Sequence, residues 1–304
     1  MGPRQRPARG EGTFLPVGSE RYCMAVPAPD LSGQVAVITG STRGIGRALA
    51  LQLAEYGADI VSTGKTVDDS DSDLEGTIHK TADAVREHGS DALAVQLDVR
   101  DPDNCQRVVD ETLDEFGRLD ILINNASAIQ MGEIGELPMN RFDLLMEVNV
   151  RGTYAMTQAA LPALRDGGGR VITNAPPLEV DRVPGMAPYA FSKMGMAFMT
   201  LSLSGEEEDV AASTLWPVTA IETRATRYFG MGSEEDWRSP QVYTDAASVL
   251  LDRDPAEVDG HSFYDEELLA SVGVEDFDQY ALVEGSNPPP SSAEMFGVEF
   301  ARDW

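Results

Sequence analysis

Lysine is almost absent from this chain of 304 residues, which contains only Lys65, Lys80 and Lys193. The 51 acidic residues against 23 basic ones give a formal net charge of -28. Such a charge repels nucleic acid and anionic lipid, so we expect neither as a partner. Abundant acidic residues with little lysine are typical of halophilic proteins, in which salt screens the repulsion. An ordinary acidic cytosolic protein is the alternative.

Cysteine and histidine are also scarce, with two and three residues respectively. Cys23 and Cys105 cannot form a disulfide framework, and no Cys/His spacing resembles a metal site, so we expect no metal. No apolar run approaches the roughly 18 residues that span a bilayer. The arginines near the N-terminus precede no apolar stretch of the kind found in secretory signals. We therefore expect a cytoplasmic protein without membrane contact, and Met24 is an alternative to Met1 as the translation start.

Apolar runs alternate with helical patterns along most of the chain. The predicted strands are 35–38, 60–63, 93–97, 121–123, 170–173 and 213–216. The predicted helices are 45–56, 74–88, 102–116, 141–164 and 189–208. Continuous apolar strands alternating with helices indicate a parallel sheet covered on both faces. We therefore expect one α/β domain, a doubly wound Rossmann-type fold over 31–284, after a disordered extension (1–30) and before an exposed Pro/Ser linker and tail (285–304).

A glycine-rich turn joins the first predicted strand to the first helix. It comprises Gly40, Ser41, Thr42, Arg43, Gly44, Ile45 and Gly46. Glycines let the backbone approach a pyrophosphate, and the helix N-terminus offers free N–H groups. The Gly-x-x-x-Gly-x-Gly spacing predicts a dinucleotide loop, although a glycine-rich turn without a ligand is the alternative.

Further motifs follow this loop in order. They are Asp98-Val99, Asn124 to Ser127, Asn149, Tyr189-x-x-x-Lys193 and Pro217 to Thr223. Across about residues 31–265, this ordered set resembles the short-chain dehydrogenase/reductase family. The resemblance implies a nicotinamide cofactor. Beyond the loop, the implied cofactor contacts are Asp98, Val99, Asn125, Ala126, Tyr189, Lys193, Ile221 and Thr223.

Several shorter segments resemble the hydroxysteroid dehydrogenase-like 2 branch of that family. They are 64–66, 124–129, 175–178, 216–221 and 277–282. That branch can carry a C-terminal sterol-carrier domain, which we expect a chain of this length to lack.

The predicted chemistry centres on Tyr189 and Lys193. Hydride transfer to a carbonyl leaves an alkoxide that needs a proton, and a phenol is a weak acid at neutral pH. A lysine four residues on lies on the same helix face and favours the phenolate. The resemblance further implies that Lys193 holds the nicotinamide ribose and that Asn149 supports a proton relay through water. A chance Tyr/Lys pair on an exposed helix face is the alternative.

One position departs from the family pattern. Thirteen residues before Tyr189, where the family usually places a serine that bonds the substrate oxygen, stands Pro176. Proline has no donor, so either Asn174 or Ser127 replaces the serine or catalysis is weak or absent. The alternative functions are therefore a dinucleotide-binding protein without turnover and another reaction on this fold, such as carbon–carbon double-bond reduction.

The expected cofactor is NADP(H) rather than NAD(H). An acidic residue near the end of the second strand usually binds the ribose of NAD, but here Gly64 and Lys65 occupy that place. Lys65 and Arg43 favour a 2′-phosphate. Against this, Asp68, Asp69, Asp71 and Asp73 follow closely, and the prediction requires them to face solvent.

The remaining expectations concern substrate and assembly. The variable segment 224–240 carries Tyr228, Phe229, Met231 and Trp237, which predict an apolar substrate pocket or a packed lid. We expect a small carbonyl or alcohol substrate, with a lipid-like molecule as one candidate. The resemblance implies a homodimer or homotetramer that assembles through the predicted helices 141–164 and 189–208. The apolar residues of the second helix are expected to serve this interface or the core; they are Met194, Met196, Phe198 and Met199.

Overall fold

The computed structural model describes residues 26–72, 75–178, 183–228, 230–297, 300 and 302. Seven parallel strands form the central sheet in the order β3-β2-β1-β4-β5-β6-β9. The strands are β1 (Val35–Ile38), β2 (Asp59–Gly64), β3 (Ala92–Gln96), β4 (Ile121–Asn124), β5 (Arg170–Asn174), β6 (Ala211–Trp216) and β9 (Ser262–Tyr264). The predicted α/β fold with a central parallel sheet is confirmed, and β9 is a strand that the sequence did not predict.

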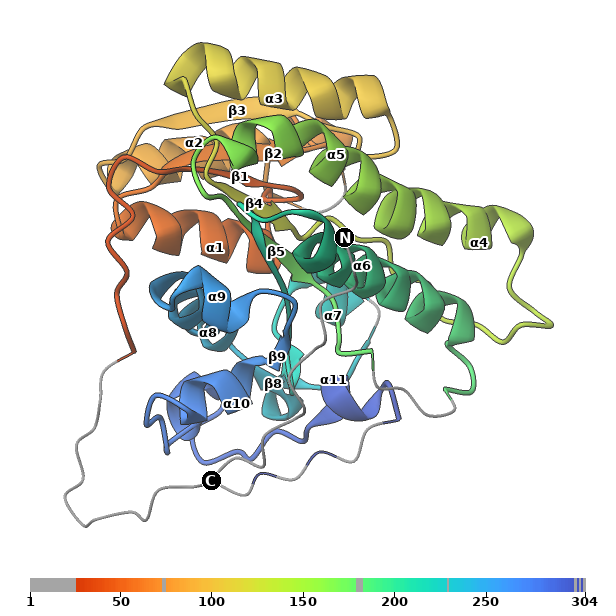
Figure 1. Ribbon diagram of the computed structural model, residues 1–304. Helices are drawn as coiled ribbons and strands as arrows, with labels where there is room; N and C mark the ends of the chain where they lie inside the picture. The colour runs from red at the N-terminus through yellow and green to blue at the C-terminus, as the bar shows by residue number, and fades with distance from the viewer. Residues whose placement is uncertain are drawn as a thin grey trace, which may run out of the picture.

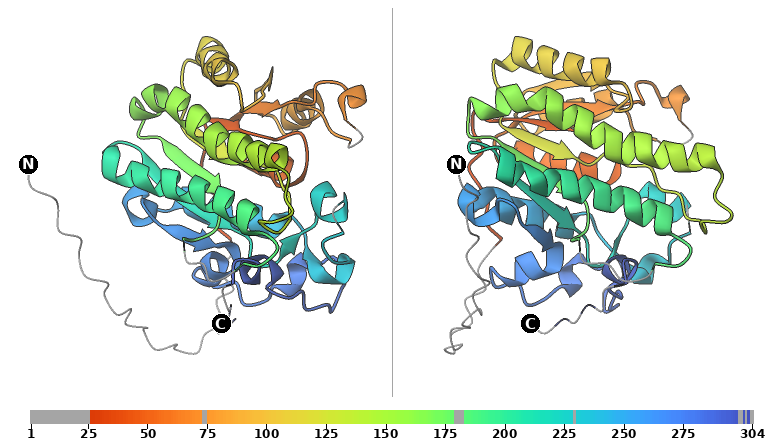
Figure 2. Two further views of the ribbon diagram at one scale, coloured as in Figure 1. Left: turned by 90° about the vertical axis from the view of Figure 1, so that its right-hand side faces the viewer. Right: turned by 45° about the vertical axis from the view of Figure 1, so that its right-hand side comes forward.

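Helices cover both faces of this sheet (Figures 1 and 2). On one face, α1 (Gly44–Glu55) packs against α2 (Ile78–Glu87) and α8 (Gln241–Asp252). On the other face, α5 (Gly152–Arg165) packs against α3 (Pro102–Phe116) and α6 (Ala187–Glu206). All four residues of β1 and of β4 are buried, which explains why β1 is apolar throughout and β4 is apolar up to Asn124.

Shorter elements complete the domain. The helices are α4 (Met139–Leu145), α7 (Arg224–Tyr228), α9 (Pro255–Val258), α10 (Asp265–Ala270) and α11 (Ser291–Glu294). Strands β7 (Ala220–Ile221) and β8 (Trp237–Arg238) form a separate two-stranded sheet. The order of the central strands reverses between β1 and β4, and in such sheets ligands bind outside the carboxyl ends at this point.

The long helix predicted over 141–164 is not continuous. After α4, residues Met146–Arg151 form a π-helical turn, and α5 begins at Gly152. A π-turn changes which side chains face inward, and Asn149 lies in it, fully buried. The helix predicted from residue 74 begins instead at Ile78, because the Thr77 hydroxyl caps it by accepting from the Lys80 N–H at 3.1 Å.

The two predicted tails differ in outcome. Residues 1–25 of the predicted N-terminal extension lie outside the described residues. The prediction of an exposed linker and tail over 285–304 is wrong at α11, where Ser292 and Ala293 are buried. Phe296, in the predicted aromatic tail, is fully buried among residues of the central domain. The proline- and serine-rich composition of this tail therefore predicted an exposed segment, although the segment packs against the domain.

Candidate active site

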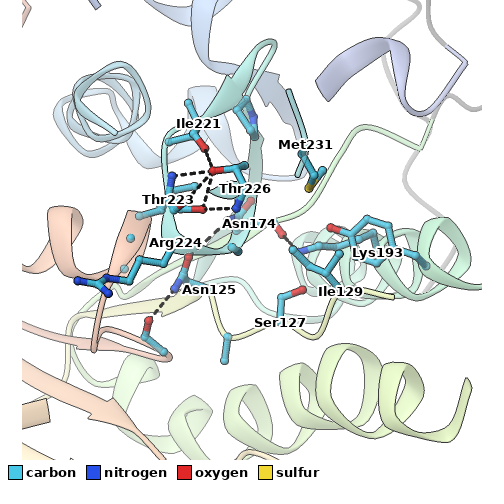
Figure 3. A pocket seen from close by; sticks show the side chains of 18 of the residues that line it. Asn125, Ser127, Ile129, Asn174, Lys193, Ile221, Thr223, Arg224, Thr226 and Met231 are labelled. Atoms are coloured by element: carbon cyan, nitrogen blue, oxygen red, sulfur yellow. Dashed lines mark hydrogen bonds between the residues drawn. The ribbon is translucent and has the colours of Figure 1, made fainter. Parts of the chain in front are cut away.

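A cavity of about 960 Å³ opens along the carboxyl ends of the parallel strands. Its lining includes the glycine loop after β1, Lys65 after β2, Asp98 after β3 and Asn125 after β4. Asn174 at the end of β5 and Lys193 on α6 line it further along, as Figure 3 shows. The cavity thus brings most of the predicted site residues together, except Ser41 and Asn149.

The glycine loop leaves no room for side chains where it turns. Gly40 has φ +70°, and a Cβ there would lie 3.1 Å from the Ala126 Cα. A Cβ on Gly46 would lie 2.5 Å from the Gly40 carbonyl oxygen. Ser41 does not line the cavity, because its hydroxyl is buried against the Ser62 hydroxyl at 3.0 Å. The backbone around Gly40, Gly44 and Gly46 is therefore free of side chains that would keep a pyrophosphate group at a distance.

Thr39, which the sequence analysis did not single out, fastens this loop to the one after β4. Its hydroxyl accepts hydrogen bonds from the N–H groups of Asn125 and Ala126 at 2.9 and 3.0 Å. The Asn125 side chain in turn donates to the carbonyl oxygens of Thr39 and Gly40 at 3.0 and 3.1 Å. Asn125 therefore has a structural function in addition to lining the cavity. A threonine directly after a buried strand was the only sequence feature that could have indicated Thr39.

The end of the cavity that lies at the carboxyl ends of β2 and β3 is charged. Asp98 accepts from Arg100 at 2.5 Å and lies 3.6 Å from the Lys65 ammonium. Hydrogen bonding from the Arg100 side chain lowers the pKa of Asp98 to about 2, so this carboxylate is ionised at neutral pH. Val99 lines the cavity next to it. A Cβ on Gly64 would lie 2.7 Å from the Thr42 methyl, so a side chain at the end of β2 would require Thr42 to move.

Arg43 crosses from the glycine loop to the segment after β2. Its guanidinium donates to the Thr66 hydroxyl at 3.0 Å, to the Gly76 carbonyl at 3.1 Å and to the Ser72 hydroxyl at 3.3 Å. Its Nε is buried without a hydrogen-bond partner among the described residues. Desolvation lowers the pKa of Arg43, and repulsion from Arg224 adds to the effect. An anion placed here would satisfy Nε and offset this repulsion.

Tyr189 and Lys193 lie one turn apart on α6, and both are buried and line the cavity. The Lys193 ammonium donates to the Asn174 carbonyl oxygen at 2.7 Å and lies 5.2 Å from the centre of the Trp216 ring. Burial lowers the pKa of Lys193 to about 7 and raises the pKa of the Tyr189 phenol well above its usual value. Burial therefore outweighs the predicted effect of the ammonium on the phenol, which remains protonated at neutral pH.

Asn149 does not reach the cavity. Its side-chain oxygen accepts from the Ala128 N–H at 2.7 Å, and its amide donates to the Ala128 carbonyl at 3.0 Å and to the Ser192 hydroxyl at 2.8 Å. The side chain thus joins the loop after β4 to α6. The geometry gives Asn149 a positioning contact beside Tyr189 and Lys193.

Pro176 is buried and does not line the cavity, whereas both proposed replacements for the missing serine do. Asn174 is buried, and its Oδ1 has no partner among the described residues. Its Nδ2 makes one long contact, 3.4 Å, with Asn125 Oδ1. Ser127 is more exposed, and its hydroxyl donates to the Ala128 carbonyl at 3.3 Å. Asn174 therefore has the greater unused hydrogen-bonding capacity.

The variable segment 224–240 contributes fewer aromatic side chains than predicted. Met231 lines the cavity, but Tyr228 is 73% exposed and Trp237 is buried with its indole N–H on the Met231 carbonyl at 2.7 Å. Phe229 lies outside the described residues. Further lining residues that the sequence did not single out are Ile129, Met131, Leu144, Met186, Trp216 and Met295. These come from five separate segments, so no local pattern could have indicated them.

Metal and membrane sites are not found in the described part of the chain. Within 26–72, 75–178, 183–228 and 230–297, no group of three or more His, Cys, Asp or Glu side chains is arranged to hold a metal ion. No helix of the described residues is long and apolar enough to cross a bilayer.

Comparison with known proteins agrees with this arrangement. The family model described as short chain dehydrogenase matches residues 34–227. Hydroxysteroid dehydrogenase-like protein 2 of Xenopus tropicalis is 38% identical over 260 residues, and the human protein of that name is 37% identical. These matches cover 84% of this chain but only 62% of each relative.

Solved structures show the same similarity. A putative dehydrogenase from Xanthomonas campestris is 36% identical with a TM-score of 0.77, covering 87% of this chain and 96% of that one. A short chain dehydrogenase from Mycobacterium thermoresistibile is 36% identical with a TM-score of 0.79, covering 85% and 94%. The chain belongs to the short-chain dehydrogenase family. Within it, the chain is similar to the hydroxysteroid dehydrogenase-like 2 branch, as its motifs predicted.

Proposed function

We propose that this protein is a nicotinamide-dependent oxidoreductase that transfers a hydride between its cofactor and a carbonyl or alcohol substrate. The observation that carries the proposal is the placement of Tyr189 and Lys193, buried side by side on α6 and facing a cavity that continues to the glycine loop. The loop fits a dinucleotide, because Gly40 and Gly46 lie where any Cβ would collide with backbone.

The residues act as follows in carbonyl reduction. The bound nicotinamide supplies the hydride. Tyr189 donates its proton to the substrate oxygen, and its raised pKa keeps the phenol protonated until this step. The phenolate that remains is buried, and the ammonium form of Lys193 stabilises it. The Asn174 carbonyl holds the Lys193 side chain in place through the 2.7 Å hydrogen bond, and Asn149 fixes α6 through Ser192.

NADP(H) is the proposed cofactor. Lys65 and Arg43 line the charged end of the cavity, Arg43 Nε is buried without a partner among the described residues, and Gly64 stands where an acidic residue would bind the ribose of NAD. The nearby acids are engaged elsewhere: Asp69 pairs with Lys80 at 2.7 Å, and Asp71 caps its own turn. Asp68 is exposed and Asp73 lies outside the described residues. Solved structures of similar proteins include both cofactors: the Thermococcus sibiricus alcohol dehydrogenase, 25% identical, with 5-hydroxy-NADP, and a Mycobacterium paratuberculosis short chain dehydrogenase, 24% identical, with NAD. The proposal therefore rests on the residues of this chain.

The cofactor proposal predicts a wild-type kcat/KM that is higher with NADPH than with NADH. Lys65→Ala should lower this ratio by about tenfold, the effect of losing one charge-assisted contact. Arg107→Ala, on the outer helix α3, is the matched control and should leave the ratio unchanged. A wild-type preference for NADH would overturn the proposal, as would an NADPH preference that survives in the Lys65→Ala/Arg43→Ala double variant.

The binding-only alternative is motivated by the buried Pro176, which supplies no donor to the cavity. A panel of ketones, aldehydes and enones, assayed for NADPH consumption, separates the possibilities. We expect consumption with at least one saturated carbonyl compound. Tight NADPH binding without consumption across the panel would favour the binding protein, and consumption with enones alone would favour double-bond reduction.

We further propose an uncharged, apolar substrate, because methionines and Trp216 line the cavity beyond Lys193. A lipid-like carbonyl compound fits this lining. The composition supports a protein adapted to high salt, since 51 acidic residues are offset by only 23 basic ones, and we keep the cytoplasm as the proposed location.

Assembly through α5 and α6 is part of the proposal. Met196 is buried in the core, but Phe198 and Phe191 on α6 are 64% and 61% exposed, and Tyr154 on α5 is 52% exposed. Large apolar side chains gathered on two adjacent helices favour burial against a second copy. Sedimentation in high salt should therefore give a dimer or tetramer. Phe198→Asp should shift it toward smaller species, whereas Leu113→Asp on α3 should not. A wild-type monomer in high salt would contradict this proposal.

A further inference from the structure

The segment that follows the Rossmann domain is bonded to the loop after β6. The N–H groups of Ser292 and Ala293 both donate to the Val218 carbonyl oxygen at 3.0 Å. In return, the Trp216 indole N–H donates to the Ser292 carbonyl at 3.1 Å. Three hydrogen bonds thus hold α11 at the carboxyl end of the sheet, below α6 in Figure 1.

Apolar packing holds the same segment against the catalytic residues. Phe296 is fully buried, and its ring lies edge-on to Trp216 with 5.3 Å between ring centres. The centres of the Phe296 and Tyr189 rings are 6.5 Å apart. Burying a phenylalanine side chain removes apolar surface from water, so this contact favours the docked position of the segment.

A third contact lies further along the chain. The Arg302 guanidinium bonds both carboxylate oxygens of Glu266 at 2.7 and 3.0 Å, the Thr219 hydroxyl at 2.8 Å and the Pro288 carbonyl at 2.9 Å. Glu266 is fully buried and also pairs with Arg238 at 2.8 Å. Arg302 therefore connects both ends of the segment to the loop after β6, and Glu266 retains a cationic partner if Arg302 is removed.

The docked segment closes one end of the cavity. Pro289, Ser291, Ser292 and Met295 belong to its lining. In the strand order, β6 lies toward one edge of the sheet and β3 forms the other edge. The end of the cavity that the segment closes is therefore the one farthest from Lys65 and Asp98, which mark the charged cofactor end. Trp216 and Tyr189 adjoin this segment, with Lys193 beside Trp216, and Asp236, which also lines the cavity, is bonded within its own turn to Ser233 at 2.8 Å.

We infer that α11 and Met295 form the far wall of the substrate site, and that Met295 sets the length of apolar carbonyl substrate that the protein accepts. The inference rests on the proposed oxidoreductase function. Methionine is flexible and polarisable, so it packs against unbranched chains of different shape. The residues that the segment itself contributes to the lining, Pro289, Ser291, Ser292 and Met295, are uncharged, so the part of the substrate that they contact is an uncharged chain.

The test measures kcat/KM for a series of straight-chain 2-ketones of increasing length with NADPH. Met295→Trp fills the end of the site and should lower kcat/KM for the longest accepted ketones by about tenfold or more, with the shortest ketones little affected. Met295→Ala should shift the optimum to longer chains. Glu294→Ala, an exposed neighbour on the same turn, is the control and should keep the wild-type profile. Unchanged length profiles in both active Met295 variants would overturn the inference.

A binding measurement separates this inference from the proposed function. If no ketone is reduced, straight-chain alcohols of graded length can compete with a fluorescent apolar probe for the cavity. Met295→Trp should then weaken competition by long alcohols but not by short ones. Equal competition in both proteins would contradict the assignment of Met295 independently of turnover.

A second variant tests whether the segment is held as described. Arg302→Gln should increase hydrogen exchange at the Ser292 and Ala293 amides while the amides of β1 and β4 stay protected. Unchanged exchange at the two α11 amides would show that Arg302 does not hold this wall in place, and would contradict that part of the inference.

Discussion

Tyr189→Phe is expected to lower kcat/KM by about 100-fold to 10,000-fold, the usual contribution of a general acid or base. The variant removes only the hydroxyl, so the ring still packs in the cluster with Trp216 and Phe296. NADPH binding should therefore be retained, and the fold should remain intact. Steady-state kinetics on a carbonyl substrate, with cofactor binding followed by fluorescence, measure both properties.

Tyr154→Phe is the matched control for this prediction, because that tyrosine lies on the neighbouring helix α5 and is 52% exposed. It should keep the wild-type rate. A Tyr189→Phe variant that reduces its substrate at the wild-type rate would show that the proton comes from another group.

Asn174→Ala is expected to have the second largest effect, a loss of about 100-fold in turnover, as when one oxyanion donor is removed. The Asn174 side chain is buried at the cavity wall with an unpartnered oxygen, and its backbone carbonyl, which holds Lys193, is unchanged by the substitution. Rotation of the terminal amide exchanges oxygen and nitrogen, so the same side chain can accept from an alcohol or donate to a carbonyl.

Ser127→Ala provides the comparison, because Ser127 lines the same cavity and was the other residue proposed to replace the missing serine. Its hydroxyl already donates to the Ala128 carbonyl, so we expect a smaller loss of turnover than for Asn174→Ala. Full activity in both variants would mean that the donor is a backbone N–H or a water molecule. Thermal unfolding of each variant separates a catalytic loss from a loss of stability.

Local sequence patterns predicted six of the seven strands of the sheet and the glycine loop, and the family resemblance implied the other cofactor contacts. Strand burial produces continuous apolar runs such as Val35–Ile38, and helix periodicity places Tyr189 and Lys193 on one face. The glycine spacing predicted a close-approach loop for the same local reason. These features depend on residues that are neighbours in the chain.

The substrate end depends on contacts between distant segments, which no local pattern reports. Met295 and Phe296 reach Tyr189 and Trp216 from a segment whose prolines and serines predicted an exposed linker. Asn149 lies in a π-helical turn and bonds Ala128 and Ser192, whereas periodicity alone predicted a regular α-helix here. Burial also reversed the expected effect on the Tyr189 pKa, since desolvation depends on the folded environment.

The most direct test of hydride transfer uses NADPH that carries deuterium at C4 of the nicotinamide ring. The account predicts that mass spectrometry of the alcohol product will show one deuterium bonded to the former carbonyl carbon, in the wild type and in whatever product Tyr189→Phe slowly forms. A product alcohol without deuterium from either C4 position, although NADPH is consumed, would contradict direct transfer between cofactor and substrate.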